Sequence, residues 1–237
     1  MKKKVIIAVN ILIIMFAVLF AFGTISKGKT AVVDGITWYY DEKDGEAINV
    51  YVYSGTIPSV VTIPETLNGL PVTKIKGWND YHNMFYTSRD EEVTTLEKII
   101  IPNTINTIGN KAFKSCNIQE LELPGGITNI NRGAFENCKI SGNLIIPDSI
   151  EVIGYGAFSG FESHEVILPE NMQTIHSGAF KGIIVDTINI PNTVKSIGEY
   201  AFEGSALKNI NIPENVTEIG SYAFKNCSAD MELKIPS

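Results

Sequence analysis

The sequence predicts a β-rich solenoid, in which short parallel strands of successive coils stack along one axis. The first observation is a fixed period of 22 or 23 residues, because prolines recur at 102, 124, 147, 169, 191 and 213. Ala-Phe pairs keep the same period, at 112–113, 134–135, 157–158, 179–180, 201–202 and 223–224. The second observation is that apolar and variable residues alternate before each proline, as in a strand with one buried face. A period in this range is the signature of a stacked repeat protein.

Each copy of the repeat gives the same local expectations. The strand should end at its proline, which has no N–H for a neighbouring strand. Ile105 and Ile108, three and six residues after Pro102, should face inward. The next position holds Gly, Asn or His, residue types that tolerate positive φ, so a tight turn is predicted at 109, 131, 154, 176, 198 and 220. Ala112, Phe113 and Cys116 have the spacing of one short helical turn.

A single coil cannot be stable alone. It buries about four aliphatic side chains and one phenylalanine, which does not offset the entropy lost in ordering its backbone. Neighbouring coils must therefore share their apolar faces by stacking.

The pattern L-x-x-I-x-I-P-x-x-I-x-x-I-G-x-x-A-F-x-x-C, first seen complete from Leu96 to Cys116, resembles the BspA-type leucine-rich repeat. The resemblance extends from about Thr56 to the end of the chain. It implies a right-handed leucine-rich repeat solenoid with one parallel sheet. It also implies a secreted or surface-displayed protein, mostly of bacteria, that takes part in adhesion by binding host, matrix or envelope proteins. A structural envelope protein without a specific ligand is the alternative, and an inhibitor or cofactor of a surface enzyme is another.

Three segments are expected. Residues 1–23 combine Lys2, Lys3 and Lys4 with an apolar run from Val5 to Gly23, which fits either a cleaved signal peptide or a retained membrane anchor. Both place the repeats outside the cell, because the lysines stay inside. Residues 24–56 form a polar linker and a β-hairpin, with strands at 35–40 and 47–53, that resembles an N-terminal cap. Residues 57–237 form the repeats.

The first coil departs from the pattern. It begins at Val60, contains a turn at Asn68-Gly69, and should bury Ile75 and Phe85. The sequence that follows Ile75 is expanded and rich in rings, with Trp78, Tyr81, His82 and Tyr86. These rings could form a binding patch, since aromatic residues dominate contact energies. They could equally complete the packing of an atypical end coil.

Composition argues against several classes of partner. The formal net charge is −7, so nucleic acid and anionic membrane surfaces are unfavourable ligands, and only the N-terminal segment could hold the chain at a membrane. The acidic turn at 41–46 lacks the spacing of a calcium loop, and no metal or cofactor is expected. Cys116, Cys138 and Cys227 share one repeat position, which favours packing, with a Cys116–Cys138 bridge as the alternative.

No catalytic arrangement is expected either. The sequence has no G-x-S-x-G motif, and His82, His164 and His176 are not spaced as metal ligands. The protein is therefore predicted not to be an enzyme.

What remains is a surface. The outward strand positions should form one continuous face, which repeat proteins use for binding. They are Lys98, Ile100, Glu120, Glu122, Asn143, Ile145, Glu165, Ile167, Thr187, Asn189, Asn209 and Asn211. Ile100, Ile145 and Ile167 would be apolar groups in water, which can mark an interaction site. The alternative is that β-branched residues simply suit strands.

Overall fold

The computed structural model describes residues 28–77, 83–85, 95–228 and 232–234. The predicted signal or anchor at 1–23 lies outside them, as do Trp78, Tyr81, His82 and Tyr86. Within these ranges, no helix has the length and apolar character needed to cross a membrane.

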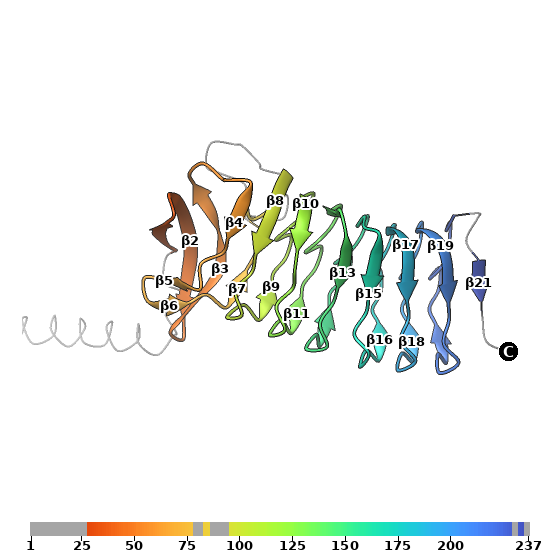
Figure 1. The fold of residues 1–237 in the computed structure, drawn as a ribbon. Helices are drawn as coiled ribbons and strands as arrows, with labels where there is room; N and C mark the ends of the chain where they lie inside the picture. The colour runs from red at the N-terminus through yellow and green to blue at the C-terminus, as the bar shows by residue number, and fades with distance from the viewer. Residues whose placement is uncertain (1–27, 78–82, 86–94, 229–231, 235–237) are drawn as a thin grey trace, which may run out of the picture.

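The predicted parallel stack is confirmed, and Figure 1 shows the coils following one another along a single axis. One side of the solenoid, here called the strand wall, contains two sheets in which every strand pair is parallel. Its strands are β4 (Val60–Thr62), β8 (Thr95–Ile100), β10 (Asn117–Leu121) and β12 (Lys139–Ile140), then β13 (Asn143–Ile145), β15 (Glu165–Ile167), β17 (Ile184–Asn189), β19 (Ala206–Asn211) and β21 (Glu232–Lys234). The strand ends two or three residues before the proline in β8, β10, β13, β15, β17 and β19, as expected, whereas β12 ends at the bend that precedes β13.

The expectation of one parallel sheet is wrong, because a second wall of short strands runs along the solenoid. It contains β7 (Lys74–Ile75), β9 (Thr107–Ile108), β11 (Asn129–Ile130) and β14 (Val152–Ile153), then β16 (Thr174–Ile175), β18 (Ser196–Ile197) and β20 (Glu218–Ile219). The inward isoleucine of each copy brings its backbone level with the same residue of the next coil. Backbone groups then pair between coils, as in the 2.7 Å bond from the Gly154 N–H to the Ile130 carbonyl.

The turns after the second wall also differ from expectation. Gly109, Gly154, Gly198 and Gly220 do not have positive φ, and positive φ occurs two residues later, for example at Lys111 (59°) and Gly133 (60°). The reason for glycine is close approach, because a Cβ at Gly109 would lie 2.4 Å from the Ile75 carbonyl oxygen. The predicted helical turn is a pair of hydrogen-bonded turns, and the described residues contain no helix.

The core is a file of phenylalanine rings inside two rows of aliphatic side chains. Ring centroids of successive coils lie 5.2–6.3 Å apart, through Phe85, Phe113, Phe135, Phe158, Phe180, Phe202 and Phe224. Ile75 and Phe85 are fully buried, as expected. Cys116 and Cys138 are buried thiols, and burial raises the pKa of the Cys138 thiol far above its usual range. These observations agree with cysteine as a packing residue.

The cap continues a wall of the solenoid instead of lying across its end. β2 (Ile36–Lys43) and β3 (Glu46–Ser54) form the expected hairpin, with Asp44 and Gly45 in the left-handed region at its turn. Part of the predicted linker is a further strand, β1 (Lys29–Val33), which pairs with β2. β3 pairs in parallel with β7, so its backbone groups extend the second wall and its buried residues join the core. The turn at Asn68-Gly69 joins the short antiparallel strands β5 (Thr66–Leu67) and β6 (Leu70–Pro71).

Candidate binding face

The outward side chains of the strand wall, here called the outer face, are arranged by the register of the strands. Lys98 is opposite Val60 on one side and Glu120 on the other. In the second sheet of the wall, Asn143, Glu165, Thr187 and Asn209 follow one another, and beside them lie Ile145, Ile167 and Asn189. Asn211 pairs with Lys234. Parallel pairing therefore aligns most of the predicted site residues in two rows.

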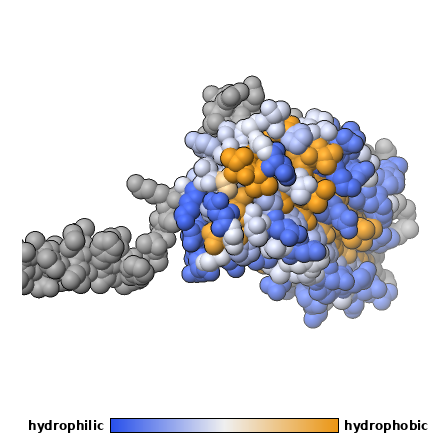
Figure 2. All heavy atoms as spheres, turned by 60° about the vertical axis from the view of Figure 1, so that its left-hand side comes forward, coloured by the Kyte–Doolittle hydropathy of each residue, from blue (hydrophilic) through white to orange (hydrophobic). Residues whose placement is uncertain are grey.

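Three isoleucines of the outer face are exposed to solvent, as the alternation predicts. Ile145 exposes 62% of its surface, Ile100 42% and Ile167 37%, whereas their strand neighbours Leu144 and Ile99 are buried. Val60, which the sequence reading did not single out, is also exposed on β4. Figure 2, which brings the cap end forward, shows hydrophobic residues interspersed with hydrophilic ones over the visible surface.

The outer face is interrupted locally, although isolated bridges from Lys139 to Glu162 and from Glu162 to Ile184 keep its coils connected. β10 pairs with β12 and not with β13, and no strand pairing joins the described residues 119–122 to 142–145. The cause is one extra residue, because Cys138 precedes Pro147 by nine positions while Cys116 precedes Pro124 by eight. The chain uses this residue in a bend at Ser141-Gly142, after which Asn143 begins a new ladder.

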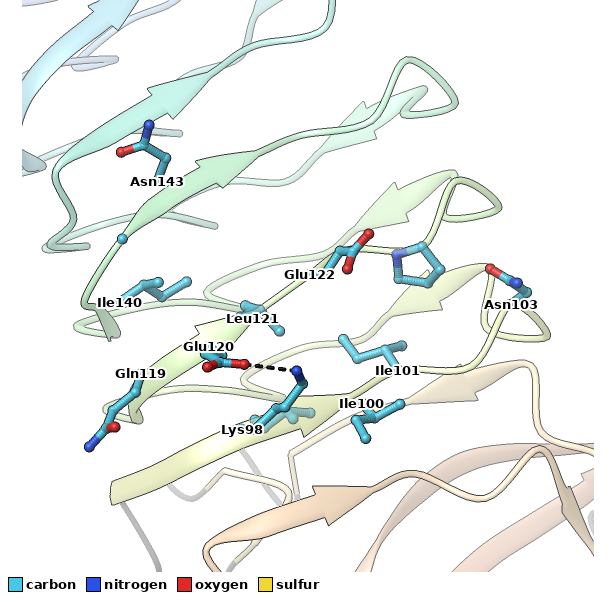
Figure 3. A pocket seen from close by; sticks show the side chains of 13 residues that line it. Lys98, Ile100, Ile101, Asn103, Gln119, Glu120, Leu121, Glu122, Ile140 and Asn143 are labelled. Carbon is cyan, nitrogen blue, oxygen red and sulfur yellow. Dashed lines mark hydrogen bonds and ion pairs between the residues drawn. The ribbon is translucent and has the colours of Figure 1, made fainter.

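A hollow of about 490 Å³ lies at this interruption, as Figure 3 shows. Ile100 and Leu121 contribute apolar surface, and Asn143 lies across the gap from Glu120 and Glu122. Among the described residues, backbone pairing between these two coils ends at the bond from the Ser141 N–H to the Ile118 carbonyl, so beyond it the hollow offers polar main chain beside apolar side chains. A surface that combines polar main chain with apolar side chains suits a polypeptide ligand better than a purely apolar ligand.

Charges on the outer face are partly paired. Lys98 Nζ lies 2.8 Å from a Glu120 carboxylate oxygen, and this hydrogen bond raises the pKa of the lysine. Glu122 extends the negative charge of the hollow. At the start of β17 and β19, Asp186 bonds to Lys208 at 2.7 Å and to His164 at 2.9 Å. The sequence reading missed this cluster, since its three members come from different coils.

For three other predicted site residues, the structure does not describe the side chain. Trp78 and Tyr81 fall in ranges the structure does not describe, and for Asn209 only the backbone is described. The interruption did have a sequence signal, the single 23-residue interval between Pro124 and Pro147 inside the regular copies. Among the described residues, no group of three or more His, Cys, Asp or Glu side chains is placed to hold a metal ion.

Comparison with known proteins gives one family match and several similar folds. The sequence profile of the BspA type leucine rich repeat region matches residues 90–205 and 141–237, with six copies. A leucine rich cell surface protein from Faecalibacterium prausnitzii has 21% identity and a TM-score of 0.50, over 87% of this chain and 56% of that one. A leucine-rich repeat protein from Bacteroides ovatus has 26% identity and a TM-score of 0.51, over 87% of this chain and 65% of that one. This chain thus spans under two thirds of the length of both structures. No curated protein matches it significantly.

Proposed function

Because the chain belongs to the BspA-type leucine-rich repeat family, we propose that it is an exported cell-surface module whose outer face binds another protein without catalysing a reaction. Leucine-rich repeat proteins generally act by binding proteins, and the similar structure from Faecalibacterium prausnitzii is a cell surface protein. An adhesin or a receptor-like scaffold is the form of this function that suits an extended face.

One observation carries the proposal, the exposure of Ile100, Ile145 and Ile167 on the outer face, where Ile100 also lines the hollow. Apolar side chains grouped beside polar ones have the composition of a protein interface, with an apolar centre and a polar rim. Lys98 and Glu120 already satisfy each other, so a partner would not need to neutralise both. Glu122 and Glu165 remain for basic groups of the partner, which fits the acidic character of the chain.

The test replaces each exposed isoleucine with lysine, which keeps the backbone and adds a charge where apolar contact is proposed. Ile100→Lys, Ile145→Lys and Ile167→Lys should each weaken capture of purified extracellular-matrix proteins or of envelope proteins by the immobilised full chain. Val152→Lys is the matched control, because Val152 is exposed to a similar extent (41%) but lies on the second wall. Unchanged capture by all three variants, with melting curves like that of the parent, would reject the outer face as the binding site.

The cellular location is part of the same proposal. Residues 1–23 would act as a signal peptide or a retained anchor, 24–56 as linker and cap, and 57–237 as the displayed repeats. Sequencing the N-terminus of the mature protein distinguishes the two forms, since cleavage would leave a chain that begins near Thr24. Recovery of the full chain in the cytosol would contradict export.

A further inference from the structure

The turns that follow the strands of the second wall carry a second cluster of charged and aromatic side chains, separate from the outer face. We call the segments 109–116, 131–138, 154–161, 176–183, 198–205 and 220–227 the turn edge. In a chain with 19 basic and 26 acidic residues, the turn edge has an excess of basic ones. Its basic residues are Lys111, Lys114, Arg132, Lys181 and Lys225, and its acidic residues are Glu136, Glu199 and Glu203.

Aromatic rings and cations alternate along this edge from coil to coil. The Arg132 guanidinium lies 5.9 Å from the centroid of the Tyr155 ring, and Lys181 Nζ lies 5.8 Å from that of Tyr200. Tyr200 stacks on Tyr222 with centroids 5.3 Å apart. Lys225 Nζ follows at 4.9 Å from the Tyr222 ring. With coils about 4.8 Å apart, the row extends for about 20 Å along the solenoid.

Two of these tyrosines occupy a backbone position that disfavours them. Tyr200 and Tyr222 have φ of 56° and 61°, at a position where other coils place Lys111, Gly133, Gly156 and Gly178. A left-handed conformation is less favourable for a bulky residue than for glycine. Backbone strain of this kind gathers at functional positions, so the two rings are candidates for a role beyond packing.

A hollow of about 240 Å³ opens at the start of the row. Its walls carry cations, carboxylate and hydroxyl groups from Lys111, Arg132, Glu136, Tyr155, Ser159 and Lys181. Glu136 pairs with Lys111 and Lys114, and Lys181 Nζ lies 2.7 Å from Glu203. Among the described residues, no ion pair is formed by Arg132, so its guanidinium remains for an outside anion. Gly156 leaves the backbone at the hollow approachable, whereas the Tyr155 ring covers Gly178.

From this arrangement we propose that the turn edge binds an acidic polysaccharide, with Arg132 holding a carboxylate, Lys181 sharing its N–H donors between Glu203 and a second carboxylate, and Tyr155 bonding to hydroxyls. The faces of the rings are already in use, since Tyr155 packs against Gly178 and Tyr200 against Tyr222. The rings therefore present edges and hydroxyl groups, which suit a hydroxylated ligand. Nucleic acid fits less well, because its bases need free ring faces.

The test measures binding of polygalacturonate oligosaccharides to the full chain in non-ionic detergent by titration calorimetry at low ionic strength. Binding should weaken with added salt, and neutral dextran should not bind. Arg132→Gln and Lys181→Gln should each reduce affinity about tenfold, as expected for loss of a charge-assisted hydrogen bond. Tyr155→Phe, which keeps the ring and removes the hydroxyl, should weaken binding by less.

Lys195→Gln is the matched control, because Lys195 is exposed beside β18 and loses the same charge away from the turn edge. The proposal is overturned if polygalacturonate does not bind, or if Lys195→Gln loses as much affinity as Lys181→Gln. Tighter binding of single-stranded oligothymidylate would overturn it in favour of nucleic acid. Melting curves of all variants verify folding. Since the outer face is not involved, failure here leaves the protein-binding proposal standing.

Discussion

Replacing Phe158 with alanine should destabilise the solenoid strongly, because this ring is fully buried and touches three others. Its centroid lies 5.3 Å from Phe135, 5.4 Å from Phe180 and 5.4 Å from Phe161, the last edge-on at 83°. Removing a buried phenylalanine costs about 3–5 kcal/mol through lost transfer energy and the remaining cavity. For a chain of this size, about 2–4 °C per kcal/mol lowers the melting temperature by roughly 6–20 °C.

Urea unfolding followed by circular dichroism measures the change in the free energy of unfolding. Calorimetry measures the change in melting temperature. Phe224→Ala is the matched control, because Phe224 stacks on Phe202 at 5.4 Å but is only half-buried. Its cost should be about half as large, since less apolar surface is lost. A loss below about 1 kcal/mol at Phe158, or one no larger than at Phe224, would show that the ring file does not hold the coils together.

Two further predictions concern the backbone and the surface charges. Gly198→Ala should lower the melting temperature, because its Cβ would lie 2.6 Å from the Ser177 nitrogen; a melting temperature equal to that of the parent would contradict the close approach. Asp186 should titrate below its ordinary pKa of 3.8 by carbon-detected NMR, chiefly because Lys208 bonds to it. Since the folded pKa is the lower one, this stabilisation is present above pH 3.8 and is lost as the pH falls through the folded value. Lys208→Gln should raise the midpoint, and a midpoint at or above 3.8 in the parent would refute the pairing.

The sequence was sufficient to predict the stack of coils, because its period, its alternation of apolar residues and its prolines all indicate the same inward-facing positions. Ile99, Phe113 and Ile108 are buried as their spacing predicts, since burial of apolar side chains fixes which face points inward. The second wall was missed because two-residue strands leave no alternation to detect. The role of the turn glycine was also predicted wrongly. Gly109 is required by the close approach of the neighbouring coil at Ile75 and not by its own torsion angles.

The candidate site was predictable only in part. The side on which Ile100 and Ile145 lie follows from alternation, but the gap between them depends on which coils pair. One extra residue before Asn143 shifts that pairing, and the sequence alone does not say whether a coil absorbs an extra residue in a loop or in its ladder. The cluster of Asp186, His164 and Lys208 likewise exists only once three coils are in register.

The two walls are interrupted at different heights. The strand wall loses its regular ladder between β10 and β13, where β12 and isolated bridges keep it connected, whereas the second wall breaks one coil later, between β14 and β16. At the later break His176 replaces the glycine that lets coils approach, and the bond that Gly154 and Gly198 donate to the preceding coil has no counterpart from the His176 N–H to Ile153 among the described residues. The irregularities of the two walls therefore lie at different levels along the solenoid axis. A force applied along the axis would meet intact backbone hydrogen bonds in one wall or the other at both junctions. The coils should therefore not separate preferentially at either junction.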